Sequence, residues 1–514
     1  MKQIKDICIL GGGTAGFTAS SMLAKHRELS GADFNIKLIH NKNIGSIGVG
    51  ESTLINFNEL VDYLGLEDHD WMKECSSTYK VSLKFSDFYK KGSYFYYPFG
   101  HVTHDDPMRS LQYYMGGMIR NPESFTPERV APFFIPMAIL AEKNKLVGVD
   151  KDLHFSIEEH SAYHFDASKF GNVLQQYSEE GGVEVIEDLF HGVELNDDGS
   201  IKSLVCEDGI YEADLFVDCT GFRSLLLGET LKEPYISFGD TLINNKVLRA
   251  KIPYTNKEEQ LKNYTDSVAL KNGWCWHIPL WDHMSVGYVH TNKFATPEEI
   301  ESEFFEHVGE VDYETLEFKT GRYERGWVKN VIGVGLSYGF IEPLESTGIA
   351  TMIMSAFRML EGISKHELCY NKVDVDLFNQ AVGNDGISHT RPFVEMHYYL
   401  SRRDDSDYWN YITEEVDFGY DTESTSKFNY DYFLHNMVNR TYYEVWPEVG
   451  TILIPGGMNF SGGSNAITLK TPVSSEEIVD LEDHIKLIED HVKPYKSSYR
   501  FLLDTIYSSE RGFG

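Results

Sequence analysis

Cysteine is scarce in this chain of 514 residues, and its spacing is not that of a metal or disulfide site. The six cysteines, at positions 8, 75, 206, 219, 275 and 369, include no C-x-x-C pair. Scattered cysteines are typical of buried free thiols in a reducing compartment, not of a disulfide framework or a zinc site. We therefore expect a cytoplasmic protein without a bound metal.

Long apolar runs are also missing. A membrane-spanning helix needs ~18 or more apolar residues, whereas the best candidate, residues 131–141, is shorter and contains two prolines. We do not expect the N-terminus to be a cleavable signal peptide, because its hydrophobic residues run directly into glycines. The sequence therefore predicts a soluble protein with no membrane partner.

Basic residues are outnumbered, with 46 Lys and Arg against 79 Asp and Glu and a net charge of −33. Such a chain repels phosphate backbones and anionic lipid surfaces, so we expect no nucleic acid partner. Aromatic residues are plentiful at 13%. They suit aromatic-lined pockets and broad interfaces, which leaves a homo-oligomer open.

The first forty residues predict a βαβ unit. A short apolar strand over 5–10 precedes glycines 11–16, a helix over about 17–25 and a second strand over 34–40. This order implies a parallel sheet. Residues 213–219 and 331–335 read as further strands of that sheet. Antiparallel strands are expected over 274–279 and 284–290, and helices over 352–365, 475–492 and 497–507.

The glycine turn has the sequence Gly-Gly-Gly-Thr-Ala-Gly, which fits G-x-G-x-x-G. In such a turn Gly11 permits the tight bend, Gly13 lets the backbone approach a pyrophosphate, and Gly16 permits close packing of helix on strand. The N-terminus of the helix that follows supplies amide donors and a partial positive charge to the phosphates. The second strand ends in His40-Asn41 instead of the usual acid. Both FAD and NAD therefore remain open at this point.

Four further stretches carry recognisable chemistry. Their sequences are Gly-Val-Gly-Glu-Ser-Thr at 48–53, Tyr-Lys-Val-Ser-Leu-Lys-Phe at 79–85, Gly-Trp-Cys-Trp-His-Ile-Pro at 273–279 and Pro-Leu-Glu-Ser-Thr-Gly-Ile at 343–349. The third has the form W-x-W-x-I-P. Taken in this order, and with Asp-Cys-Thr-Gly-Phe-Arg at 218–223, they resemble the flavin-dependent halogenases of the tryptophan-halogenase type.

The resemblance implies an α/β, Rossmann-like FAD-binding flavoprotein fold with mixed sheets and a mainly helical C-terminal part. It implies a halogenase core over 1–350 and a helical region over 351–514 that covers the substrate site, packed as one body.

The resemblance also implies that reduced FAD, O2 and a halide generate hypohalous acid, which travels through an internal tunnel to Lys80. As an ammonium, Lys80 would polarise this acid by a hydrogen bond; as a neutral amine, which burial favours, it would form a haloamine. Glu345 would orient that species, stabilise charge on the attacked ring or take its proton. Lys84 is expected to be a surface lysine on a strand. No second dinucleotide site is evident, so a separate flavin reductase would supply FADH2.

By the same resemblance, three groups of residues line the remaining sites. FAD would contact Gly11, Gly13, Thr14, Ala15, Gly16, His40, Val49, Glu51, Phe190 and Ile349. The halide, whether chloride, bromide or iodide, would be held by the turn amides of Thr347 and Gly348, which form an anion nest at a helix start. The substrate and tunnel would be lined by Tyr97, Phe99, Trp274 and Trp276.

The substrate end departs from family members that act on free tryptophan. Tyr97 stands where the family has a histidine, and residues 429–437 lack the acidic cluster and aromatic pair that hold the amino-acid end. We therefore expect a small electron-rich arene, an indole or a phenol, in place of free tryptophan.

Two alternatives are weighed against the halogenase. A flavin-dependent aromatic monooxygenase would carry Gly-Asp near the flavin, but Gly335 is followed by Leu336 and Ser337. A non-catalytic FAD-binding protein would have no use for Lys80.

Overall fold

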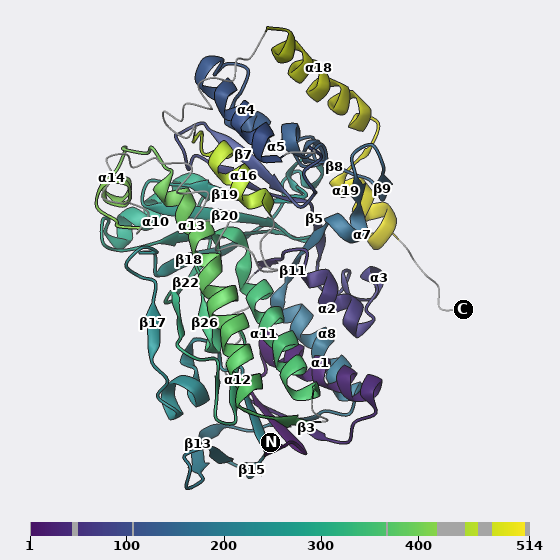
Figure 1. The fold of residues 1–514 in the computed structure, drawn as a ribbon, viewed down its shortest axis with the longest axis vertical. Helices are drawn as coiled ribbons and strands as arrows, with labels where there is room; N and C mark the ends of the chain where they lie inside the picture. The colour runs from purple at the N-terminus through teal and green to yellow at the C-terminus, as the bar shows by residue number, and fades with distance from the viewer. Residues whose placement is uncertain are drawn as a thin grey trace. The chain divides into compact units, whose positions relative to one another are not determined.

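The computed structural model describes residues 2–43, 50–104, 107–365, 368–418, 448–460 and 475–508. The chain forms two compact units, each assembled from three separate segments (Figure 1). The first unit contains Met1–Ser77, Phe165–Gly239 and Phe318–His389. The second contains Thr78–His164, Asp240–Glu317 and Thr390–Gly514.

The first unit is built on a six-stranded sheet. Its order is β12 (Glu184–Glu187), β3 (Asn35–His40), β2 (Asp6–Leu10), β16 (Leu215–Asp218), β25 (Val331–Gly333) and β24 (Trp327–Val328). All pairs are parallel except β24 with β25. The central strands are short runs of buried apolar residues, as expected where both faces of a parallel sheet are covered.

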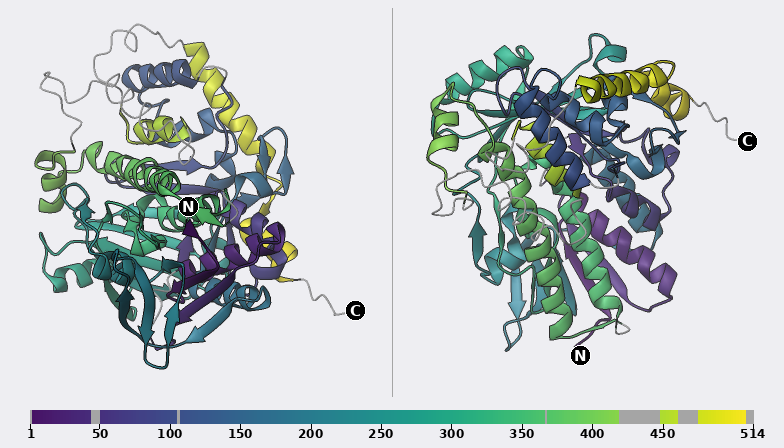
Figure 2. Two further views of the ribbon diagram at one scale, coloured as in Figure 1. Left: turned by 60° about the horizontal axis from the view of Figure 1, so that its bottom comes forward. Right: turned by 45° about the horizontal axis from the view of Figure 1, so that its top comes forward.

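Helices pack on this sheet and on each other. They include α1 (Thr14–Ser30), α8 (Ala167–Glu180), α11 (Thr347–Ser364) and α12 (Lys372–Phe378), and α11 and α12 lie side by side (Figure 2). The hydroxyls of Ser20 on α1 and Ser178 on α8 lie 2.7 Å apart in the buried interface. The α/β character and the parallel sheet predicted from the sequence are therefore present.

Smaller elements complete the first unit. Strand β1 (Lys2–Gln3) pairs with β27 (Cys369–Tyr370). Two three-stranded sheets contain β13 (Phe190–Leu195), β14 (Ile201–Cys206) and β15 (Ile210–Glu212), and β17 (Tyr235–Ser237), β23 (Gly321–Tyr323) and β26 (Gly339–Phe340). The other elements are strand β4 (Gly50–Ser52), helices α2 (Phe57–Leu64) and α3 (Asp68–Trp71), and the 3-10 or π-helical segments η1 (Gly221–Arg223), η2 (Leu225–Thr230), η3 (Gly335–Ser337), η4 (Pro343–Glu345) and η5 (Asn379–Ser388).

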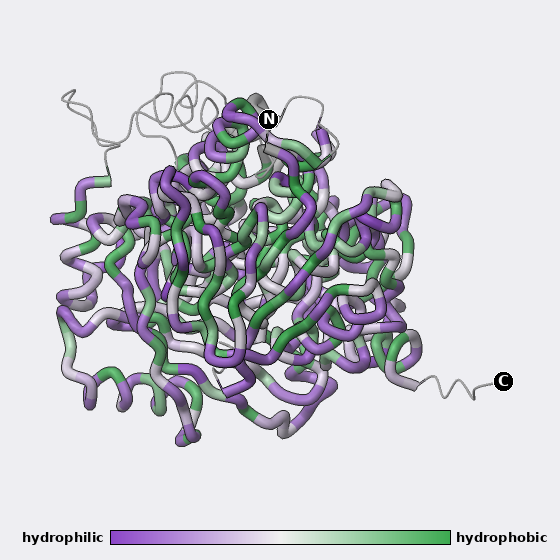
Figure 3. The backbone as a smooth tube through the Cα atoms, turned by 90° about the horizontal axis from the view of Figure 1, so that it is seen from below, coloured by the Kyte–Doolittle hydropathy of each residue, from purple (hydrophilic) through white to green (hydrophobic). Residues whose placement is uncertain are grey.

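The second unit is built on a seven-stranded mixed sheet. Its order is β22 (Tyr313–Glu317), β18 (Lys246–Ile252), β21 (Met284–His290), β20 (Gly273–Pro279), β19 (Tyr264–Ala269), β6 (Ser82–Ser86) and β7 (Tyr94–Pro98). Only β19 with β6 is parallel. One face carries a core cluster that includes Cys275, Val286 and Tyr288 and packs on Ile300 and Phe304 of α10 (Pro297–Val308). Figure 3 shows hydrophobic segments along the strands and hydrophilic ones in many connecting turns.

The opposite face of this sheet is covered by later helices. Gly450 and Gly457 of α16 (Glu448–Gly457) lie so close to β7 that a Cβ on them would come within 2.7 Å of the Tyr97 hydroxyl and 2.1 Å of the Phe95 ring. His397 of α13 (His389–Tyr399) stacks on Phe95, with ring centroids 5.9 Å apart.

The remaining elements of the second unit are short strands and helices. They are β5 (Thr78–Lys80), β8 (Lys145–Leu146), β9 (Val149–Asp150), β10 (Phe155–Ser156), β11 (Ala162–Asp166), β28 (Lys496–Ser497), α4 (Pro107–Arg120), α5 (Pro127–Phe134), α6 (Ala138–Glu142), α7 (Ile157–His160), α9 (Lys257–Gln260), α14 (Asp407–Glu414), α18 (Ser475–Val492), α19 (Ser498–Leu502) and η6 (Leu503–Tyr507). None of the helices in the described part of the chain is both long and apolar enough to span a membrane.

The two compact units do not divide the chain at residue 350, which is the boundary expected from the sequence. Residues 351–389 belong to the first unit and residues 390–514 to the second. The reason is the order of the strands: each sheet takes strands from distant segments, so the chain passes between the units several times. The packing of the two parts as one body stays a prediction.

Candidate functional site

The glycine turn lies between β2 and α1 in the first unit. Gly11 has φ 114°, and a Cβ there would lie 2.3 Å from the Cys219 carbonyl oxygen. A Cβ on Gly16 would lie 1.8 Å from the Gly11 carbonyl oxygen. At Gly13, by contrast, a Cβ would meet nothing within 4 Å. The outer glycines therefore permit close packing, and the middle one leaves open space above the turn.

The first turn of α1 faces this open space without a side-chain cap. Gly13 is the N-cap and provides no side-chain hydrogen bond. The Thr14 hydroxyl donates to the Ala167 carbonyl at 3.3 Å, and Ala15 lies beside Gly335. Uncapped amides at a helix N-terminus bind anions well. The turn is thus suited to a dinucleotide phosphate.

His40 lies directly beside the turn. A Cβ on Gly12 would come within 2.7 Å of the imidazole Nδ1, and the His40 ring meets Phe17 edge-on at 5.9 Å. Desolvation lowers the pKa of His40, which keeps the imidazole neutral and able both to donate and to accept a hydrogen bond. The His40 carbonyl accepts a hydrogen bond from the Asp188 amide at 2.8 Å, two residues before half-buried Phe190.

Glu51 lies on β4, in the second glycine-rich stretch. Its side chain is half-buried, and desolvation raises the pKa of the carboxyl to about 7. Val49, another residue expected to contact FAD, lies outside the described residues.

Asp218 organises the far side of the turn. Its buried carboxylate accepts hydrogen bonds from the amides of Leu226 and Leu227 at 2.8 and 2.9 Å and from the Thr220 hydroxyl at 2.6 Å. Its carbonyl accepts from the Val334 amide at 3.0 Å and from the Ser337 hydroxyl. Asp218 therefore holds β16 and the loop after β25 in place. Asp218 belongs to the motif at 218–223, but the spacing of that motif does not reveal this role.

The start of α11 forms a second uncapped helix end in the first unit. Ser346, with φ 58°, is its N-cap and makes no side-chain capping hydrogen bond. Buried Thr347 and half-buried Gly348 open the helix, and a Cβ on Gly348 would meet nothing within 4 Å. This is the geometry of an anion nest.

The residues on either side of this nest are buried. Glu345, at the end of η4, has no exposed surface, and Ile349 is 6% exposed. The dinucleotide turn, His40 and the segment from Glu345 to Ile349 all lie in the first unit.

Lys80 lies on β5 in the second unit and is fully buried. It pairs with Ala162 of β11, and its Nζ is 5.1 Å from the centroid of the half-buried Phe99 ring. Lys84 lies on β6 instead, its side chain is 19% exposed, and it forms an ion pair with Asp266 at 3.1 Å. Sequence spacing does not distinguish the two lysines, but their surroundings in the structure do.

A buried chain of polar side chains anchors the strand of Lys80, and no motif in the sequence predicts it. The Thr78 hydroxyl donates to the Pro279 carbonyl at 2.6 Å and lies 2.9 Å from His164 Nδ1. His164 Nε2 lies 2.9 Å from the Thr265 hydroxyl. Because the single hydroxyl proton of Thr78 goes to Pro279, we assign the His164 proton to Nδ1, and Nε2 accepts from Thr265. Desolvation, with a smaller effect of Lys80, keeps the pKa of His164 well below its ordinary value.

The W-x-W-x-I-P stretch is strand β20. Because side chains alternate along a strand, Trp274 and Trp276 share one face, with ring centroids 6.1 Å apart. The Trp276 indole lies across Gly287, where a Cβ would be 2.0 Å from the ring. Its buried Nε1 has no hydrogen-bond partner in the part of the chain that the structure describes.

Tyr97 and Phe99 have different surroundings. Tyr97 is buried, with its hydroxyl next to Gly450 of α16, and Phe393 of α13 also lies next to that glycine. Phe99 is the aromatic residue beside Lys80. Residues 429–437, on which the substrate prediction partly depends, lie outside the described residues.

Comparison with known proteins places this geometry in a family. A family model for tryptophan halogenase matches residues 6–448. The chain belongs to the tryptophan halogenase family. It is 32% identical to tryptophan 7-halogenase RebH of Lentzea aerocolonigenes, over 79% of this chain and 78% of that protein.

Solved structures agree with this membership. The VirX1 apo structure matches with a TM-score of 0.87 and 32% identity, covering 99% of this chain and 100% of that one. Tar14, a tryptophan C-6 flavin-dependent halogenase, matches with a TM-score of 0.81 and 29% identity, covering 97% and 99%. The predicted family, the FAD-binding Rossmann-like fold and the enzyme class, a flavin-dependent halogenase and thus an oxidoreductase, are confirmed.

Membership of the tryptophan halogenase family implies FAD, and the residues present fit it. The open space at Gly13 and the uncapped start of α1 suit the pyrophosphate. The neutral imidazole of His40, beside the turn, can donate a hydrogen bond to a hydroxyl group or accept one from it. Halide use is typical of the family.

Proposed function

We propose that this protein is an FADH2-dependent halogenase that uses O2 and a halide to halogenate an electron-rich indole or phenol through Lys80. The overall reaction joins FADH2, O2, halide, one proton and the arene, and yields FAD, the haloarene and two waters. Bound reduced FAD would supply two of the four electrons that reduce O2 to water, and the conversion of halide and arene to haloarene would supply the other two. A separate flavin reductase would return FAD to its reduced form.

The observation that carries this proposal is the burial of Lys80 beside Phe99. A lysine without exposed surface is costly unless its surroundings use its charge or its amine. In this position the ammonium can donate a hydrogen bond to the oxygen of hypohalous acid, which makes the halogen more electrophilic. The Phe99 ring, 5.1 Å from Nζ, offers one wall for a flat arene.

The other roles follow from the two uncapped helix ends and from Glu345. The start of α1 would bind the FAD pyrophosphate, and the amides of Thr347 and Gly348 would bind the halide. The buried Glu345 carboxylate would stabilise the positive charge that develops on the attacked ring and accept the ring proton. FAD would also contact Val49, Glu51, Phe190 and Ile349.

Trp274 and Trp276 would separate the flavin from the organic substrate. Both indoles lie on one face of β20, and both are large and buried. Their bulk would let halide and hypohalous acid reach the reactive positions while excluding the arene from the flavin.

The proposed substrate differs from that named for RebH and Tar14, which is tryptophan. Tyr97 is packed against α16, so it is not available to bind an amino-acid group as a histidine there would. We propose that residues from 390 onward, which supply α13 and α16, cover the arene. A mainly apolar cover of this kind would suit a substrate without a zwitterion.

The test supplies FAD, a flavin reductase and NADH under air with chloride, bromide or iodide, and follows indole, a simple phenol and free tryptophan by mass. The proposal predicts halogenated indole or phenol, faster than halogenated tryptophan. Halogenation should be lost in Lys80→Ala and Glu345→Gln with FAD binding retained. Hydroxylated product without halogen would support a monooxygenase, and efficient regioselective halogenation of tryptophan would refute the substrate assignment.

A further inference from the structure

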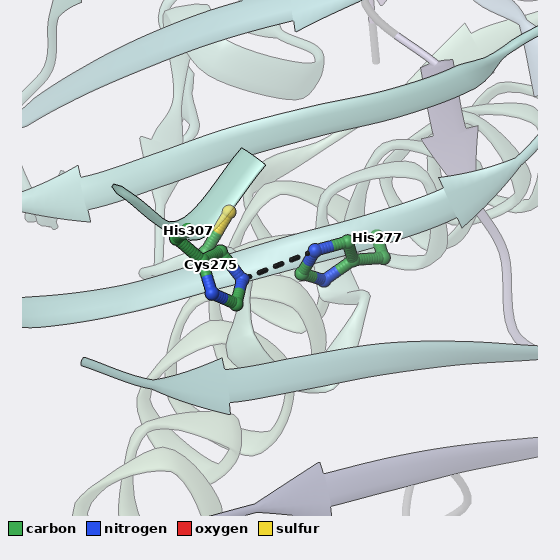
Figure 4. A group of neighbouring side chains, drawn as sticks. All are labelled: Cys275, His277 and His307. Carbon is green, nitrogen blue, oxygen red and sulfur yellow. Dashed lines mark hydrogen bonds between the residues drawn. The ribbon is translucent and has the colours of Figure 1, made fainter. Parts of the chain in front are cut away.

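A cysteine and two histidines converge on the second unit's sheet, on the face away from the two tryptophans. Cys275 and His277 alternate with Trp274 and Trp276 along β20, so their side chains point to the face covered by α10. His307, near the end of α10, meets them there. Figure 4 shows His277 and His307 directed at each other, with Cys275 beside them.

We propose that Cys275, His277 and His307 form a binding site for a thiophilic transition-metal cation of the zinc class. The sulfur and one nitrogen of each imidazole all lie within 4.8 Å of one another. This site does not depend on the proposed halogenation chemistry.

The distances suit tetrahedral coordination with little movement. Zinc bonds of about 2.3 Å to sulfur and about 2.05 Å to nitrogen place two nitrogens about 3.3 Å apart, and sulfur and nitrogen about 3.6 Å apart. The two Nε2 atoms are 3.2 Å apart, which is already the required separation. Only the sulfur must approach, by about 1 Å at most.

The ligand set is chemically selective. A thiolate with two imidazoles favours zinc, and also copper(I), over magnesium or calcium, which prefer oxygen. Cys275 would bind as a thiolate and give its proton to solvent. The fully buried sulfur sits in the core cluster, whereas both histidines are half-buried, and a water would be the fourth ligand.

The surrounding charge favours a cation. Asp266, the neighbour of His277 across β19 and β20, acts electrostatically on all three ligands. Glu303 of α10 and Asp87 also act on His307. Lys84 opposes them, but it is paired with Asp266.

Without a metal, the two imidazoles satisfy each other only partly. One Nε2 must carry a proton and donate to the other, and the buried Nδ1 of His277 has no hydrogen-bond partner among the residues that the structure describes. A bound cation would use both Nε2 lone pairs at once and fix the orientation of both rings.

The experiment titrates the full-length protein with Co²⁺ as a spectroscopic probe, and measures zinc by mass spectrometry after incubation with Zn²⁺ and desalting. We expect about one metal per chain, a thiolate-to-cobalt charge-transfer band, and a melting temperature raised by Zn²⁺. Cys275→Ala should abolish the charge-transfer band, and His307→Gln should weaken binding at least about tenfold.

Controls separate this site from other metal contacts. Cys206→Ala and His283→Gln, which alter a cysteine and a histidine outside the site, should bind as wild type does. The Asp150, Asp152 and His491 group also brings its ligand atoms within 4.8 Å, so His491→Gln is included. The proposal is overturned by wild-type protein without a thiolate band at saturating Co²⁺, by unchanged binding in Cys275→Ala or His307→Gln, or by loss in His491→Gln instead.

Discussion

The side-chain hydroxyls of Ser52 and Ser346 lie 3.0 Å apart in the buried interior of the first unit, although 294 residues separate them in the sequence. Ser52 ends β4, within the second glycine-rich stretch, and Ser346 is the N-cap of α11. This hydrogen bond therefore connects a segment proposed to line the flavin with the residue that precedes the proposed halide nest.

Ser52→Ala removes this hydrogen bond. We expect a loss of about 1 kcal/mol in the free energy of unfolding, together with a several-fold increase in the halide KM, because the turn before Thr347 becomes less fixed. Steady-state kinetics at varied halide, with urea unfolding, checks both. Ser20→Ala, which breaks the buried pair with Ser178, is the matched control: it should show the stability loss without the KM change. Equal KM values in the two variants would contradict the role given to Ser52.

Thr78→Val should slow halogenation by perturbing the strand of Lys80. The change removes the donor to the Pro279 carbonyl and the partner of His164 Nδ1. We expect destabilisation of about 1–3 kcal/mol and a fall in kcat of roughly tenfold or more, because small displacements of a reacting group are costly. The KM for the arene should change little, since Thr78 positions Lys80 and does not bind substrate.

Thr78→Ser provides the decisive comparison for this positioning role. It keeps the hydroxyl, so kcat should return to near the wild-type value. A purely structural threonine would give Thr78→Ser and Thr78→Val the same kcat once both are measured well below their melting temperatures.

Glu51 should make the stability of the flavin-free protein depend on pH. Its folded pKa, about 7, is above the ordinary value of 4.5, so the folded state holds a proton that the unfolded state has already lost. Stability from this group is therefore full below about pH 4.5 and falls as pH rises toward 7, by about 3 kcal/mol at most. Urea unfolding at pH 5 and pH 8 should show this loss in wild type and not in Glu51→Gln. A wild-type loss that persists in Glu51→Gln would assign it to other groups.

Local features of the fold are readable in the sequence. The alternation of Trp274, Trp276 and Ile278 predicts strand β20, and the apolar spacing over 475–492 predicts α18 with the bounds observed. The boundaries of α1 are less readable: the expected helix over 17–25 extends to Thr14–Ser30, because it runs to Gly31, which ends it with φ 66°. Likewise α11 begins at Thr347, before the apolar spacing becomes regular.

Long-range relationships are not readable in the same way. His164 and Thr265 meet beside Thr78 although they are 86 or more residues from it or from each other. Cys275 and His277 do not have C-x-x-C spacing, so the sequence does not predict a zinc site there. The third proposed ligand, His307, comes from a helix 30 residues further along the chain. Periodicity reports which face a residue occupies, whereas these contacts depend on strand order and on helix packing across a sheet.

The proposed function requires that Lys80 itself, and not the nearby Lys84 of β6, delivers the halogen. Its most direct test compares halogenated product from wild type, Lys80→Met and Lys84→Met under identical FADH2 supply, with FAD affinity measured in each. We expect Lys80→Met to lower the rate of halogenation by about 100-fold or more while FAD binding persists. Lys84→Met, which loses the ion pair with Asp266 and the contact with the Tyr94 ring, should keep most of its activity. Halogenation by Lys80→Met at a rate near that of wild type would contradict the role proposed for Lys80.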